Sequence, residues 1–176
     1  MWAGFIPARI SGSFHELHAV PAFLTPLSAT LVHAGLLHVS MNMVMLIFCG
    51  RQVEAVLGAR DVALLYVVGA YAAAAGQWLL DPHSSIAMVG ASGAISALIG
   101  VYALLFSRQK VVRIGFLSEA MVRALWLGAA WVVFQVMSLY LMQGSGYSIA
   151  IAAHIGGFIA GLILARPLLA WKYRHA

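Results

Sequence analysis

Long apolar runs separated by short polar turns occupy most of this chain from residue 36 onward. A helix that crosses a bilayer needs about 20 consecutive apolar residues, and it satisfies its own backbone hydrogen bonds in lipid. Only 9% of the residues are charged, whereas soluble domains carry about a quarter. We therefore expect an all-α polytopic membrane protein. The runs predict five transmembrane helices, at about residues 36–57, 62–80, 93–106, 124–142 and 149–169.

Residues 1–35 lack a run of that length. Residues that interrupt long helices are spread along them, namely Gly4, Pro7, Gly12, Pro21 and Pro26. Polar side chains are added by His15, Glu16 and His18. We expect this part to be an interfacial segment that lies on or dips into the membrane surface, and residues 1–176 to form a single membrane domain.

The basic residues are unevenly divided between the two ends of the predicted helices. Nine of the ten belong to the loops that follow the first, third and fifth spans, or to the flanks of those loops, and Arg9 is on the other side. The nine are Arg51, Arg60, Arg108, Lys110, Arg113, Arg123, Arg166, Lys172 and Arg174. Cytoplasmic loops carry an excess of Lys and Arg, so we expect this side and the C-terminus in the cytoplasm. Residues 1–35, 81–92 and 144–148 then face outward, and the net charge of +5 indicates topology and not nucleic-acid binding.

A serine between glycines begins the short third span, in the sequence Gly90-Ala91-Ser92-Gly93. About 14 residues follow Ser92 before the span ends, which gives a helix of roughly 21 Å against about 30 Å of hydrocarbon. Ser92 is thus expected below the outer membrane surface, in a cavity that water reaches. A polar side chain at that depth is a candidate functional residue. Gly, Ala and Ser also let membrane helices pack closely, so packing and chemistry both fit this stretch.

A stripe of small residues also marks the last span, where His154 borders it. The stripe repeats every four residues and consists of Ala153, Gly157 and Gly161. The third span carries a matching stripe of Gly93, Ala97 and Gly100. If the two stripes face each other, His154 reaches Ser92 and supplies the base that a serine hydroxyl needs to become a nucleophile. The alternative is that His154 only hydrogen-bonds a neighbouring helix.

Two polar residues four apart, His38 and Asn42, share one face near the outer end of the first span. Acyl transfer builds an oxyanion that needs preorganised hydrogen-bond donors. An Asn amide, a His N–H and the Ser92 backbone N–H are suitable donors. The alternative is a polar pair that only joins helices.

The remaining residue types restrict the chemistry. The five carboxylates lie in loops or at span ends, so a Ser–His dyad is expected in place of a triad; they are Glu16, Glu54, Asp61, Asp81 and Glu119. Zinc is the main rival use of the histidines, but His33 and His38 are five residues apart and no His-Glu-x-x-His pattern is present. We expect no metal and no cofactor. The single cysteine, Cys49, lies inside an apolar run and is interpreted as a packing residue.

Taken together, these segments resemble the rhomboid family of intramembrane serine proteases, over about residues 24–170. The resemblance implies a rhomboid-like helical bundle with Ser92 as the nucleophile and His154 as the general base. It implies an oxyanion hole made by His38, Asn42 and backbone N–H groups. It also implies that Gly90 lies in the loop bordering the site, that His33 is structural, and that Gly157 and Gly161 pack the last helix against the serine helix, which begins at Gly93. Family members cleave transmembrane proteins near the outer end of a helix in the lipid bilayer, without metal or cofactor. The resemblance to bacterial members also implies location in a bacterial cell (inner) membrane.

Two features depart from the family pattern. Many bacterial members carry a tyrosine four residues after the serine, where this chain has Ser96. The family core has six spans and five are visible here, so the first span is expected to be missing through truncation or a misplaced start codon. In-frame upstream DNA should then encode about 20 further apolar residues.

Two alternative functions remain beside the protease. One is a rhomboid-fold protein that binds membrane proteins without cutting them, as an inactive remnant that lacks the first span. The other is a small transporter or channel, which polar residues in several spans would suit. An internal repeat with paired broken helices, typical of transporters, is not visible in the sequence. Oligomeric state, gating element and physiological substrate are left open.

Overall fold

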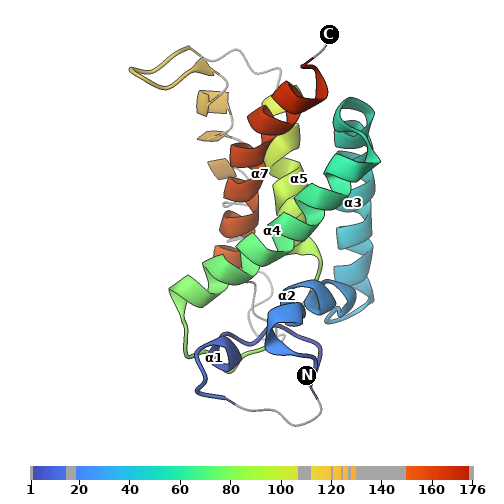
Figure 1. Ribbon diagram of the computed structural model, residues 1–176, viewed down its shortest axis with the longest axis vertical. Helices are drawn as coiled ribbons and strands as arrows, with labels where there is room; N and C mark the ends of the chain where they lie inside the picture. Colours follow the sequence, from blue (N-terminus) through green and yellow to red (C-terminus); the bar gives the residue numbers. More distant parts are fainter. Residues whose placement is uncertain are drawn as a thin grey trace.

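The computed structural model describes residues 2–14, 19–106, 112–119, 121–123, 125–126, 128–129 and 150–174. Regular structure in this part of the chain is helical. Four helices form the bundle in Figure 1: α3 (Leu36–Leu57), α4 (Ala59–Leu80), α5 (Ser92–Phe106) and α7 (Ile151–Lys172). By length and composition, α3, α4 and α7 are long and apolar enough to cross a membrane, and α5 is shorter. The fold is the all-α membrane bundle that the apolar runs predicted.

The helix bounds differ from the predicted spans at three places. The second helix begins earlier than the predicted span at 62–80: Gly58, with a φ of +88°, separates α3 from α4, which begins at Ala59. An acidic residue in the first turn, Asp61, suits that helix start. The third predicted span begins one residue earlier, at Ser92, and the fifth runs from Ile151 to Lys172. Most of the predicted span 124–142 and the loop 144–148 lie outside the described residues.

Helix α5 is the centre of the bundle and is packed against α3, α4 and α7 (Figure 1). Its residues from Gly93 to Val101 are all buried. Small residues let α4 approach it closely, since a Cβ at Gly69 would lie 2.7 Å from the Cβ of Ala97. Larger apolar side chains, including Leu57, Leu65 and Leu98, fill the core toward the end where α5 finishes.

The N-terminal segment folds over the end of the bundle where α5 begins (Figure 1). It contains the short helices α1 (Pro7–Ile10), η1 (Ala22–Leu24), α2 (Thr25–Ser28) and η2 (Ala29–Leu31). Backbone pairing joins it to the loop before Ser92: Phe5 N–H donates to the Met88 carbonyl at 3.0 Å, and Met88 N–H donates back to Phe5 at 2.7 Å. The helices in the described part of residues 1–35 are short, and Pro7, Pro21 and Pro26 lie at or beside their starts. His15, Glu16 and His18 lie outside it.

Candidate active site

Ser92 and His154 are in direct contact although they are 62 residues apart in the sequence. Ser92 is the first residue of α5, and His154 is in the first turn of α7. The Ser92 Oγ lies 2.6 Å from the His154 Nε2. For the hydroxyl to donate this hydrogen bond, Nε2 must be the unprotonated nitrogen, and the proton of the neutral ring is then on Nδ1. His154 is buried and Ser92 is half-buried, so the surrounding protein shields the pair at the point where α5 begins.

Close packing of Gly157 and Gly161 on α5 brings the two helices near enough for this contact, and we call this region the α5–α7 seam. A Cβ placed on Gly157 would overlap the carbonyl oxygen of Gly93, and one on Gly161 would overlap that of Ala97. The two small-residue stripes therefore face each other, with backbone against backbone. Larger residues at these positions would separate α5 from α7 by the width of a side chain, and Ser92 would lose its contact with His154.

His38 and Asn42 come from α3 and lie near the loop that precedes Ser92. The buried Asn42 side chain donates from Nδ2 to the His38 carbonyl at 2.8 Å. The His38 Nδ1 accepts the Ala34 backbone N–H at 3.3 Å, so the proton of a neutral His38 is on Nε2. His33 packs edge-on against the His38 ring, with ring centroids 5.1 Å apart. His38 is thus held on two sides with a donor nitrogen turned away from its own helix.

Gly90 provides the surface on which His38 rests. A Cβ at Gly90 would lie 2.6 Å from Cε1 and 2.7 Å from Nε2 of His38. The φ of Gly90 is +108°, a conformation that residues with a side chain rarely adopt. Both facts require glycine, and they bring α3 next to the loop that leads into Ser92. Gly90 N–H in turn donates to the Ala29 carbonyl at 2.9 Å, which ties this loop to the N-terminal segment.

Three residues that shape the site escaped the sequence analysis: Phe5, Ala29 and Met88. Each acts through its backbone amide or carbonyl. Backbone hydrogen bonds between distant segments leave almost no mark on side-chain identity, so no motif could have revealed them. The sequence shows only that Phe5 and Ala29 are apolar, which is compatible with the burial that the structure gives them.

Ser96 stands one turn after Ser92 and is fully buried. Its hydroxyl donates to the Ser92 carbonyl at 2.8 Å, within the same helix, as mid-helix serines often do. A Cβ at Gly157 would lie 3.3 Å from the Ser96 Cβ, so Ser96 forms part of the α5–α7 seam.

Comparison with known proteins gives consistent matches. The family model for the Rhomboid domain matches residues 21–171. "Rhomboid-related protein 2" of Mus musculus is 30% identical over 139 residues, which is 77% of this chain and 45% of that protein. "Rhomboid protease GlpG" of Serratia proteamaculans is 32% identical over 152 residues, which is 84% of this chain and 48% of that protein. "RHOMBOID-like protein 4" of Arabidopsis thaliana is 30% identical over 149 residues, or 81% and 33%.

The chain spans about half or less of the length of these three relatives. The matched residues nevertheless include the four described helices of the bundle, apart from the last residue of α7, and the contact between Ser92 and His154. With most of its length matched, as the motifs at residues 38–42, 90–93 and 153–157 predicted, the chain belongs to the rhomboid family.

Proposed function

We propose that this protein is an intramembrane serine endopeptidase in which Ser92 is the nucleophile and His154 is the general base. The observation that carries the proposal is the 2.6 Å contact between Ser92 Oγ and His154 Nε2. The serine hydroxyl attacks a peptide carbonyl while its proton passes to Nε2. The same proton then goes to the leaving amine, and water hydrolyses the acyl-enzyme with His154 again as base.

The oxyanion of each tetrahedral intermediate is assigned to donors from two helices. His38 supplies its Nε2–H, in the tautomer set by the Ala34 contact. An Asn amide nitrogen carries two N–H groups, so Asn42 has a second one to donate after its bond to the His38 carbonyl. The backbone N–H of Ser92, at the start of α5, is the third donor. Such donors are most effective when they are held in place before the reaction, and Gly90 and His33 provide that support for His38.

The substrate class and the orientation are also part of the proposal. The turn from α3 to α4 and the end of α7 lie at one end of the bundle, and the N-terminal segment and the start of α5 lie at the other (Figure 1). The basic residues concentrate at the first of these ends, which assigns it to the cytoplasm. Ser92 then opens to the outer side of a bacterial cell membrane and acts on transmembrane proteins near the outer end of their helices. No metal or cofactor takes part in this scheme.

The proposal is tested by reconstituting the protein in liposomes with a reporter protein that has one transmembrane helix. We expect the reporter to be cut once, near the outer end of its helix, with the position read by mass spectrometry. The Ser92→Ala variant provides the blank and should leave the reporter intact. Equal cutting by both proteins would contradict the assignment of Ser92. If the wild type cuts nothing, the non-catalytic binding protein becomes the better description.

Replacing Asn42 with alanine should slow turnover without unfolding the protein. Loss of one oxyanion donor typically costs about 100- to 1000-fold in kcat. The Asn42 amide bonds a carbonyl of its own helix, four residues away, so no hydrogen bond between helices is lost. The measurement pairs kcat for the reporter with the thermal unfolding midpoint. A fall in both, with kcat reduced only in proportion to the unfolded fraction, would assign Asn42 to structure instead.

A further inference from the structure

A tight turn projects from the bundle at the end opposite to Ser92 and has no role in the proposed chemistry. It covers residues 112–117 and is closed by two backbone hydrogen bonds: Leu117 N–H donates to Ile114 at 2.9 Å, and Ile114 N–H donates to Leu117 at 3.3 Å. Gly115 takes a φ of +55° at its tip. Figure 1 shows this segment reaching sideways from the end of the bundle where α7 finishes. The turn thus has a defined shape and a position outside the packed helices.

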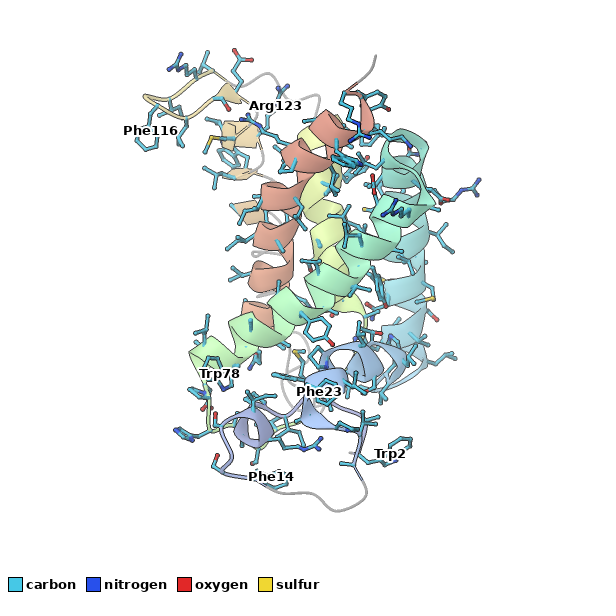
Figure 2. All side chains as sticks on the ribbon, in the orientation of Figure 1. Trp2, Phe14, Phe23, Trp78, Phe116 and Arg123 are labelled. Carbon is cyan, nitrogen blue, oxygen red and sulfur yellow. The ribbon has the colours of Figure 1, made fainter. Side chains whose placement is uncertain are left out.

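Three side chains of this turn are apolar and exposed, those of Val112, Ile114 and Phe116. Phe116 at the tip is 89% exposed, and Val112 is 78% exposed. Figure 2 shows Phe116 pointing away from the bundle at the outer edge of the molecule. Exposed apolar surface costs roughly 25 cal/mol per Å² relative to its burial, and an aromatic side chain carries 150–250 Å² of it. A turn that exposes this much apolar surface near the helix ends is suited to insert into the boundary between lipid headgroups and acyl chains.

Arg113 adds a positive charge with a fixed direction. Its Nε donates to the Gly115 carbonyl across the turn at 3.1 Å. A guanidinium has five N–H donors, so four remain on the two terminal nitrogens, and the side chain is exposed. Guanidinium groups bind phosphate through paired hydrogen bonds. The segment that follows the turn carries Glu119 and Arg123, the latter labelled in Figure 2.

An open apolar groove of about 280 Å³ lies directly beside the turn. It is lined by Ile114, Leu117, Val122, Leu125, Trp126 and Ala129. Two of these, Ile114 and Leu117, belong to the turn itself. The described residues that line this groove are apolar, apart from the indole N–H of Trp126, and Arg113 belongs to the adjoining turn. An apolar groove beside a guanidinium matches the two parts of one anionic phospholipid, an acyl chain and a phosphate headgroup.

We propose that residues 112–117 and this groove bind an anionic phospholipid, with the phosphate on Arg113, an acyl chain in the groove and Phe116 inserted in the bilayer. The proposed orientation faces this end toward the cytoplasmic leaflet, whose anionic lipids attract basic residues. Binding itself does not depend on the proposed proteolysis, and it is measured equally well in the Ser92→Ala protein. Failure of one proposal therefore leaves the other standing.

Affinity for phosphatidylglycerol is measured by native mass spectrometry of the detergent-solubilised protein, with phosphatidylcholine as the comparison lipid. Arg113→Gln should weaken phosphatidylglycerol binding about ten-fold, the typical effect of losing a charge-assisted hydrogen bond to the phosphate. Arg113→Lys keeps the charge but loses the paired hydrogen bonds, so its affinity should lie between those of the wild type and Arg113→Gln. Arg60→Gln is the matched control, because Arg60 is an exposed arginine at the same end of the bundle, in the first turn of α4. It should leave the affinity unchanged.

Insertion of the turn is measured with a fluorophore on Val112→Cys. The native Cys49 is buried, so a thiol-reactive dye reports on residue 112. In nanodiscs that contain phosphatidylglycerol brominated on its acyl chains, we expect strong quenching that Arg113→Gln reduces and Arg60→Gln does not. Quenching by an aqueous quencher alone would place the turn in water or on a protein partner and overturn the proposal. Equal loss of lipid affinity in Arg113→Gln and Arg60→Gln would also overturn it, because diffuse charge would then suffice.

Discussion

Replacement of His154 with alanine is expected to lower reporter cleavage by at least about three orders of magnitude. Ser92 Oγ has its base at 2.6 Å, and a serine hydroxyl without a base is a weak nucleophile. Loss of one member of a catalytic unit costs nearly as much as loss of the whole unit. The measurement is the initial rate of reporter cleavage in liposomes, normalised to the amount of folded protein.

The matched control for this prediction is His83→Ala. His83 is an exposed histidine in the loop that leads toward Ser92, where its Nδ1 lies 3.4 Å from the Ser13 hydroxyl. It should retain cleavage close to wild type. A His154→Ala protein that still cuts within ten-fold of wild type, on the order of one step of 1.4 kcal/mol, would rule out His154 as the base.

The second large effect is expected for Gly157→Ala. A Cβ there overlaps the carbonyl oxygen of Gly93, so α7 has to move away from α5. Overpacking of this kind typically costs about 1–3 kcal/mol of stability. It also shifts His154, three residues away on the same helix, and a displacement of about 1 Å at a reacting pair can cost about 100-fold in rate. We expect a lower unfolding midpoint and a fall in cleavage of that size.

Gly35→Ala is the control because it makes the same chemical change. A Cβ at Gly35 meets nothing within 4 Å, and its φ of 174° is extended backbone open to any residue. It should leave both stability and cleavage unchanged. Inside a helix, Gly→Ala is otherwise favourable by about 1 kcal/mol, so a stabilised and fully active Gly157→Ala protein would show that the α5–α7 seam is looser than the structure implies.

The contact between α5 and α7 could be predicted from the sequence, whereas the position of His38 could not. The four-residue spacing of Ala153, Gly157 and Gly161 is a property of one helix, and it predicted which face of α7 meets α5. The seam then followed, because small residues on both helices allow backbone contact. The position of His38 on Gly90 did not follow, since it depends on where α3 stands relative to the loop before α5. A positive φ at Gly90 is likewise invisible to a pattern of residue types.

The turn after α3 is a second case in which residue types did not predict the backbone conformation. The predicted spans left residues 58–61 between two helices, but the single residue Gly58, with a φ of +88°, separates α3 from α4. A contact with the residue that follows α7 lies beside this turn: the Tyr173 hydroxyl donates to the Val56 carbonyl, in the last turn of α3, at 2.9 Å. That contact joins residues 117 positions apart, and only the folded bundle reveals it.

The most direct test of the Ser92–His154 dyad is labelling by a fluorophosphonate probe, with the modified residue mapped by mass spectrometry. We expect one adduct, on Ser92, in the wild type and its near-complete loss in a His154→Ala protein whose unfolding midpoint is unchanged. Asn42→Ala should be labelled more slowly, because the phosphonyl oxygen also uses the oxyanion donors. An adduct on another serine, or labelling of Ser92 at the wild-type rate without His154, would contradict the dyad.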